Sequence, residues 1–265
     1  MSTHRKSAAV AAAVCAAALT LSGCAESQRD KGGEGSGGGE QAAGGTLTFG
    51  AAGEPKLFDP FYATDGETFR ITRQLFEGLL EIEPGTAKVG PGLATKWESN
   101  EDGTQWTFTL KEGVTFHDGT PFNAEAVCKN FERMYNQTGA GQSPSVSAYW
   151  QDTMGGFADG KVDSLYKGCK APEDNKAVVT ITEPTSKFPT MLTLSSLSMQ
   201  SPTAMEKYKA NDVKAQGEGF AYPEYATKHP TGTGPFTFAG YDRANKTIKL
   251  KRNEDYHGDK VKLDE

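Results

Sequence analysis

The sequence has few of the residue types that build metal or catalytic centres. Its 265 residues include only four histidines and four cysteines. None of them shows the C-x-x-C or H-E-x-x-H spacing that is typical of zinc sites. We therefore expect no metal site and no cofactor, and we expect that the protein is not an enzyme.

An excess of basic residues is also absent, and long apolar runs are scarce. The chain has 28 lysines and arginines against 34 acidic residues, a net charge of −6, which argues against nucleic acid as a partner. The apolar run from Ala8 to Leu21 is shorter than the roughly 18 residues that a membrane-spanning helix needs. These features indicate a globular domain rather than one embedded in a membrane.

The N-terminus has the pattern of a secretion signal. Basic Arg5 and Lys6 precede the apolar run, which ends in the sequence Leu-Ser-Gly-Cys at Cys24. We therefore predict a signal peptide over residues 1–23 and lipidation of Cys24, which anchors the mature protein to a membrane. The alternative is an ordinary signal peptide cut at an A-x-A site, for which the downstream sequence offers no good match.

A flexible linker is predicted after the lipidation site. Residues 24–45 are rich in glycine, serine and glutamate and contain almost nothing that could be buried. Removing Arg5 and Lys6 with the signal leaves 26 basic residues against 34 acidic ones, a net charge near −8. The remaining chain, about 220 residues, is long enough to bury a sizeable core.

Two cysteines remain after the signal and the lipidation site. Cys128 and Cys169 form an even pair in an oxidising compartment. We predict a disulfide between them, which would stabilise the fold by about 4 kcal/mol through the loop it closes. The alternative is two buried free thiols, because the sequence does not show how close their Cα atoms lie.

Apolar spacing and turn residues predict a mixed α/β (α+β) domain. Thr64 followed by Glu67 has the form of a capping box before a helix over residues 67–81. Residues 137–176 are predicted to be irregular. The other expected elements are strands over residues 46–50, 96–98, 106–110 and 177–182, helices over 123–135 and 202–210, and a hairpin of 236–239 with 247–252.

Four segments of the sequence resemble a known family. They read GTLTFGAAGEPKLFDP, ITRQLFEGLLEIEP, GLATKWESNEDGTQWTFTLKEGVTFHDGTPFNAEAV and TGTGPFTFAGYDRANKTIKLKRNEDYHGDKVKLDE. In this order they resemble the N-terminal half of the solute-binding proteins of peptide, nickel and dipeptide ABC importers, bacterial solute-binding protein family 5. The W-T-F-x-L-K-x-G-V-x-F-x-D-G-x-P-F stretch is the most distinctive part.

The resemblance implies a fold and a domain organisation. The fold is a periplasmic-binding-protein-like, two-lobed fold of type II, in its extended peptide-binding class. Because family members are about twice as long, we expect this chain to be truncated to the first lobe, with the second lobe absent. Residues 46–88 and 200–265 would form lobe I, and residues 89–199 its β-rich subdomain.

The resemblance also points to cleft residues. The backbone of Ala63, Thr64, Asp65 and Gly66 is expected to line the cleft, where exposed N–H and C=O groups can pair with a peptide main chain. Asp65 would hold a ligand amine, or alternatively cap the following helix.

Two further pairs of residues are candidates for the same cleft. Tyr149 and Trp150 would be pocket walls or, equally well, core residues. Thr233 and Gly234 lie in a G-T-G-P turn and would contact the solute or serve only the bend.

The implied function is that of an extracytoplasmic receptor, in the periplasm or at the cell surface. It would bind a dipeptide or oligopeptide solute as a monomer and deliver it to an ABC permease and its ATPase. Within the family the alternatives are a nickel chelate, haem or an oligosaccharide as solute. Outside it, the alternative is a secreted hydrolase or a signalling protein that uses this fold.

Overall fold

The computed structural model describes residues 44–265. The predicted signal peptide, Cys24 and the linker up to residue 43 lie outside the described residues. Within the described range, no helix is both long enough and apolar enough to cross a membrane.

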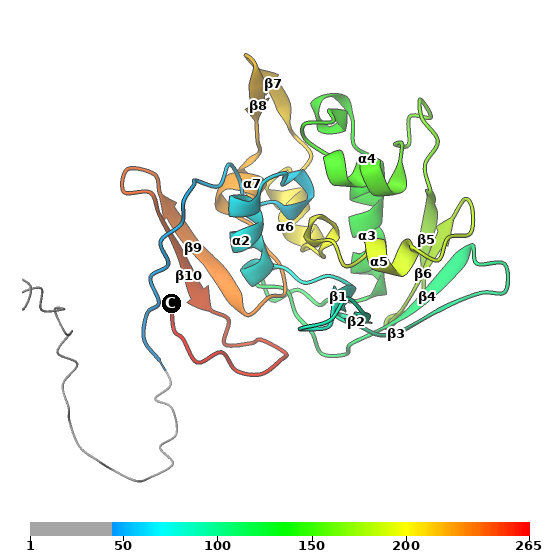
Figure 1. Cartoon of the computed structure of the whole chain (residues 1–265), viewed down its shortest axis with the longest axis horizontal. Helices are drawn as coiled ribbons and strands as arrows, with labels where there is room; N and C mark the ends of the chain where they lie inside the picture. Colours follow the sequence, from blue (N-terminus) through cyan, green and yellow to red (C-terminus); the bar gives the residue numbers. More distant parts are fainter. Residues whose placement is uncertain (1–43) are drawn as a thin grey trace, which may run out of the picture. The chain divides into compact units, whose positions relative to one another are not determined.

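Helix α3 (Ala124–Tyr135) covers one face of the largest sheet (Figure 1). It begins after Asn123, whose side-chain oxygen accepts a hydrogen bond from the backbone N–H of Ala126 at 2.9 Å. Val127, Phe131 and Met134 recur at helical spacing and are buried. This apolar face packs against strands β5 and β6, so the helix that the sequence predicts over residues 123–135 is confirmed.

The sheet itself has four antiparallel strands in the order β3-β4-β6-β5. On β6, Ala177, Val179 and Ile181 are buried and alternate with more exposed residues, as expected for a strand with one face on the core. The four strands are β3 (Ala94–Ser99), β4 (Gln105–Leu110), β6 (Lys176–Ile181) and β5 (Tyr166–Glu173).

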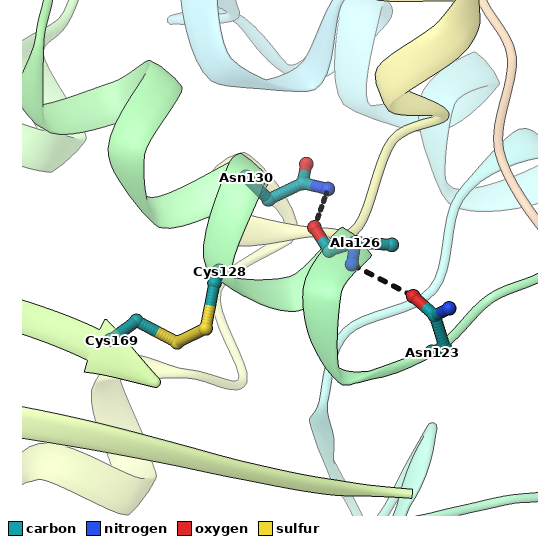
Figure 2. The surroundings of a disulfide bond; sticks show 5 residues. All are labelled: Asn123, Ala126, Cys128, Asn130 and Cys169. Carbon is teal, nitrogen blue, oxygen red and sulfur yellow. Dashed lines mark hydrogen bonds between the residues drawn. A yellow bond between two sulfur atoms is a disulfide. The ribbon is translucent and has the colours of Figure 1, made fainter. Parts of the chain in front are cut away.

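A disulfide between Cys128 and Cys169 joins α3 to β5, as the sequence predicts. Figure 2 shows it beside the first turns of α3, where the Asn130 side chain donates a hydrogen bond to the carbonyl of Ala126 at 2.9 Å. The same Asn130 amide exchanges two hydrogen bonds with the backbone of Gln200, at 2.8 and 3.0 Å. Helix α3 is therefore fixed on two sides.

A second group of elements surrounds helix α2 (Gly66–Leu75), which contacts strand β9 and the short helix η3. Strands β9 and β10 form the hairpin that the sequence predicts. Two further hairpins are β1–β2 and β7–β8. The bounds are η1 (Pro60–Tyr62), β1 (Leu80–Ile82), β2 (Val89–Pro91), η2 (Gly139–Gln142), α4 (Ala148–Met154), α5 (Phe188–Met191), η3 (Ser195–Leu197), α6 (Pro202–Lys207), β7 (Lys214–Gln216), β8 (Gly219–Ala221), α7 (Glu224–Lys228), β9 (Phe236–Asp242) and β10 (Thr247–Arg252).

The predicted helix over residues 67–81 is wrong at its C-terminal end. Helix α2 ends at Leu75, and Leu80 already belongs to strand β1. Gly78 separates the two elements, and a Cβ there would lie only 2.7 Å from the carbonyl oxygen of Leu80. Tertiary packing therefore stops a helix that the apolar spacing alone would continue.

The predictions for residues 137–176 and 202–210 also need correction. The first range contains helix α4 and the whole of strand β5, and the second helix ends at Lys207. Strand β5 lies at an edge of the sheet and is mostly exposed, so its sequence lacks the apolar alternation that would reveal a strand.

The strand predicted over residues 46–50 is absent. This segment is extended but unassigned, and the side chains of Leu47 and Phe49 are exposed. It lies beside the other end of the described chain: the N–H of Gly44 donates to Lys262, that of Leu47 to Glu265, and that of Asp264 to Gly45. This backbone pairing ends at Leu47, so residues 48–50 have no partner strand in the described chain with which to form a ladder.

Candidate functional site

The segment from Ala63 to Gly66 connects η1 to helix α2. Ala63 is buried and its N–H donates to the carbonyl of Pro60 at 3.2 Å, whereas Thr64 and Gly66 are exposed. In the described part of the chain, the backbone N–H groups of Thr64 and Asp65 have no hydrogen-bond partner. The segment therefore presents free main-chain groups to solvent, the chemistry that an extended peptide can use.

Asp65 is the N-cap of α2. Its Oδ1 accepts the backbone N–H of Thr68 and its Oδ2 accepts the Thr68 hydroxyl, both at 2.9 Å. The capping residue is thus Asp65, and the capping box that the sequence suggests from Thr64 is wrong by one position. The carboxylate is only partly buried, so capping leaves it accessible from one side.

Tyr149 contacts the helix that follows this segment, whereas its neighbour Trp150 belongs to the core. The rings of Tyr149 and Phe69 of α2 meet in a T-shaped arrangement, with 5.5 Å between the ring centroids. Trp150 is fully buried and its indole N–H donates to the carbonyl of Gly156 at 3.0 Å. Of the two readings that the sequence leaves open, the structure gives Trp150 the core role and keeps Tyr149 half-exposed at the candidate site.

Thr233 and Gly234 lie beneath the surface, against the C-terminal end of α2. The Thr233 hydroxyl donates to Glu77 at 2.7 Å, and the backbone N–H of Gly234 donates to Leu75 at 3.0 Å. A Cβ on Gly234 would lie 2.6 Å from the carbonyl oxygen of Gln74. In this structure both residues are inaccessible to a solute, and their visible role is to bring the turn close to the helix.

Glu77 is a largely buried charged residue, with a side chain 10% exposed, that sequence reasoning missed. Its carboxylate accepts hydrogen bonds from Thr233, from the Tyr256 hydroxyl at 3.1 Å and from His257 at 2.9 Å. Burial raises the pKa of the Glu77 carboxyl, but the hydrogen bonds from His257, Thr233 and Tyr256 outweigh it, so the pKa lies below its ordinary value. Glu77 therefore stays ionised and holds three separate segments together.

His117 holds the other side of the same turn. Its Nδ1 accepts the backbone N–H of Gly232 at 3.3 Å, and its Nε2 lies 3.0 Å from the carbonyl oxygen of Gly234. These two contacts are satisfied together by the neutral ring with its proton on Nε2. Burial lowers the pKa of His117, although the Gly234 carbonyl and the charges of Glu77 and Asp118 act in the opposite direction.

Two hollows open elsewhere on the surface, both beside helix α6. They have volumes of about 570 and about 390 Å³. Neither is lined by a residue that the sequence predicts for the cleft. Among residues 44–265, no group of three or more metal-ligating side chains lies close enough together to hold a metal ion. The candidate site is therefore the open wall made by Thr64, Asp65, Gly66, Phe69 and Tyr149.

The chain resembles curated proteins over most of its described length. It is 31% identical over 227 residues to the dipeptide-binding protein of Escherichia coli K12, which covers 83% of this chain and 39% of that protein. It is 31% identical to di/tripeptide-binding protein 1 of Pseudomonas aeruginosa, covering 84% and 40%. The chain thus spans about two fifths of the length of these relatives.

Solved structures agree on the fold. The chain matches the periplasmic binding protein DppA of Helicobacter pylori, in complex with the peptide STSA, with a TM-score of 0.66 and 30% identity. The match covers 84% of this chain and 42% of that one. The predicted fold class is confirmed, and the covered share agrees with one lobe of a two-lobed protein.

A family model supports the same conclusion directly. The model for the bacterial extracellular solute-binding proteins, family 5 (middle), matches residues 88–265. This range contains the main sheet, α3 and the β9–β10 hairpin. The chain therefore belongs to family 5 of the bacterial extracellular solute-binding proteins.

Proposed function

We propose that this chain forms one wall of a peptide receptor that serves an ABC importer. The observation that carries the proposal is the main chain of Thr64–Gly66, which has exposed residues and N–H groups unpaired within the described chain, at the start of a helix whose Phe69 contacts the half-exposed ring of Tyr149. Such a wall can pair with a peptide backbone without reading its side chains, which suits a receptor for many peptides. The receptor would bind its solute unchanged and would not act as an enzyme.

The relatives support a short peptide as the solute. The names of the E. coli and P. aeruginosa relatives refer to dipeptides and tripeptides. A similar structure from Pseudoalteromonas sp. SM9913, 28% identical with a TM-score of 0.63, is a dipeptide-binding protein in complex with Met-Leu. The whole receptor would place its solute between this wall and residues supplied from outside the chain.

The proposal includes the predicted anchoring and organisation. Acylated Cys24 would hold the receptor at the extracytoplasmic face of a membrane, and residues 24–45 would act as its flexible tether. Residues 46–88 and 200–265 would form the body of the lobe, with residues 89–199 as its β-rich subdomain. A monomer would deliver peptide to the permease and its ATPase.

A second solute class is favoured by one relative. Heme-binding protein A of Haemophilus influenzae is 27% identical over 258 residues, covering 95% of this chain and 44% of that protein. Haem therefore remains the alternative solute, and it is included in the test below.

Thermal unfolding with ligand tests the proposal. The full-length product of the gene, including any sequence after Glu265, is melted alone, with a library of di- to pentapeptides, and with haemin. A ligand that binds only the folded state raises the melting temperature. A rise with the library and none with haemin supports the peptide receptor, and recovery of intact peptide excludes hydrolysis. A rise with haemin alone would replace peptide with haem.

A further inference from the structure

Arg73 lies on the face of helix α2 that forms the candidate site. Asp65, Phe69 and Arg73 are spaced four residues apart, so their side chains follow one side of the helix. Arg73 is exposed, whereas Phe69 is almost buried beneath it. The wall that begins at Thr64–Gly66 thus continues along α2 to a cationic group.

Arg73 differs from every other arginine of the described residues. The other four each have a carboxylate within ion-pair distance: Arg70 with Glu67, Arg133 with Asp59, Arg243 with Glu54, and Arg252 with Glu254 and Asp264. Within residues 44–265 no carboxylate lies within 4.0 Å of the Arg73 guanidinium. Its charge is therefore available to an anion from outside.

The Arg73 side chain is nevertheless held in one orientation. Its Nε donates a hydrogen bond to the hydroxyl of Ser195 in η3 at 2.9 Å. Its guanidinium lies 5.9 Å from the centroid of the Phe69 ring, which also forms a T-shaped pair with Tyr149. The two terminal NH₂ groups have no hydrogen-bond partner among the described residues. An arginine fixed through Nε and free at both Nη atoms suits a carboxylate.

We propose that Arg73 binds a carboxylate of the solute, an inference that rests on the proposed peptide receptor. Arg73 lies eight positions after the N-cap Asp65, a rise of about 12 Å at roughly 1.5 Å per residue. An extended peptide covers about 3.3 Å per residue. A peptide paired with Thr64–Gly66 therefore presents its carboxylate to Arg73 about three or four residues further along, from its C-terminus or from an acidic side chain.

Peptide affinity of the full-length protein tests this assignment. Isothermal titration compares wild type, Arg73→Gln, Arg73→Lys and the control Arg70→Gln, which changes an exposed arginine of the same helix that already has a carboxylate partner. The ligands are di-, tri- and tetra-alanine with a free C-terminus, the same peptides amidated, and amidated tetrapeptides that carry Glu or Gln. Circular dichroism checks that each variant is folded.

We expect Arg73→Gln to weaken the binding of tri- or tetra-alanine about ten- to hundredfold, which corresponds to the loss of a charge-assisted hydrogen-bonded pair. The affinity of Arg73→Lys should lie between those of wild type and Arg73→Gln. The affinity of Arg70→Gln should equal that of wild type. Amidation should remove the difference between wild type and Arg73→Gln if the C-terminus is the source. A difference that persists only for the amidated Glu peptide identifies an acidic side chain as the source.

If Arg73→Gln loses the same affinity for peptides with and without a carboxylate, or loses no affinity at all, the proposed role of Arg73 is wrong, while the proposed peptide receptor still holds. A wild type that binds none of the peptides overturns the proposed function itself, and the assignment of Arg73 with it.

Discussion

Arg133 and Asp59 form an ion pair that is almost completely removed from solvent. The guanidinium NH2 group lies 2.5 Å from Asp59 Oδ2, and the two side chains are 5% and 0% exposed. Arg133 also donates to the carbonyl of Ala210 at 3.2 Å and to the side chain of Asn211 at 3.0 Å. One side chain of α3 thereby joins the turn before η1 to the segment after α6.

Removing Asp59 should therefore destabilise the protein strongly. Asp59→Ala leaves a buried guanidinium without its counter-charge, and we expect a loss of about 3–5 kcal/mol in the free energy of unfolding. Urea denaturation measures it. The control is Glu224→Ala, which breaks the exposed pair with Lys228 and should change stability far less, because solvent screens exposed ion pairs. Similar losses in the two variants would contradict a special role for the buried pair.

Reducing the disulfide should also lower stability. Cys128 and Cys169 are 41 residues apart, and opening a loop of this size is expected to cost about 4 kcal/mol. Denaturant titration of oxidised protein, reduced protein and the double variant Cys128→Ala/Cys169→Ala measures the loss. Two free thiols in protein isolated without reductant would show that the bridge does not form.

His117 should make stability depend on pH. Its pKa is lowered in the folded state by burial. At pH values between this lowered pKa and the unfolded value, the unfolded chain binds a proton that the native chain does not. The stabilisation is complete above the unfolded value of about 6.5 and declines as pH falls through the folded-state pKa. Urea titrations at a series of pH values should show a smaller decline in His117→Gln than in wild type. Equal declines would refute the prediction.

A methyl group at Gly232 should be poorly tolerated. A Cβ there would lie 2.1 Å from the carbonyl oxygen of Leu75, so the turn would have to move away from α2. We expect Gly232→Ala to cost about 1–3 kcal/mol. Gly168→Ala is the control, since a Cβ at Gly168 meets nothing within 4 Å. Melting temperatures compare the two variants, and equal values would mean that the turn adapts without cost.

The two roles of Asp65 can be separated by substitution. Asparagine caps helices as well as aspartate does, so Asp65→Asn should keep stability while Asp65→Ala loses about 1 kcal/mol. If Asp65 also holds a solute amine, peptide affinity falls in both variants; calorimetry on the full-length protein measures this. Unchanged affinity in Asp65→Asn would leave Asp65 with its cap alone.

The sequence predicts the elements whose side-chain pattern is set locally. Helix α3 and strand β4 are correct within a residue, because Asn123 is a strong cap and the strand alternates. The end of α2 could not be predicted, since Phe76 and Leu79 continue the helical spacing. What stops the helix is the packing around Gly78, which involves backbone atoms distant in sequence.

The candidate site was only partly predictable for the same reason. The family resemblance points to Thr64–Gly66 and Tyr149, and the structure places Tyr149 against Phe69 of the helix that begins at Gly66. Arg73 and Glu77 lie only a few residues further along the chain. The sequence around an arginine, however, does not show whether its guanidinium has a carboxylate partner. The partners of both residues lie far along the sequence, Ser195 for Arg73 and His257 for Glu77.

The pairing of residues 44–47 with residues 262–265 has a consequence for the order of folding. The hydrogen bond from Gly45 to the side chain of Asp264 closes a separation of 219 residues. Contacts of such range carry a large loop-closure cost and slow folding. Residues 44–47 are synthesised long before Asp264, so they must wait for the end of this stretch before they can pair, and Leu47 has no hydrogen-bond partner there until Glu265 has been made.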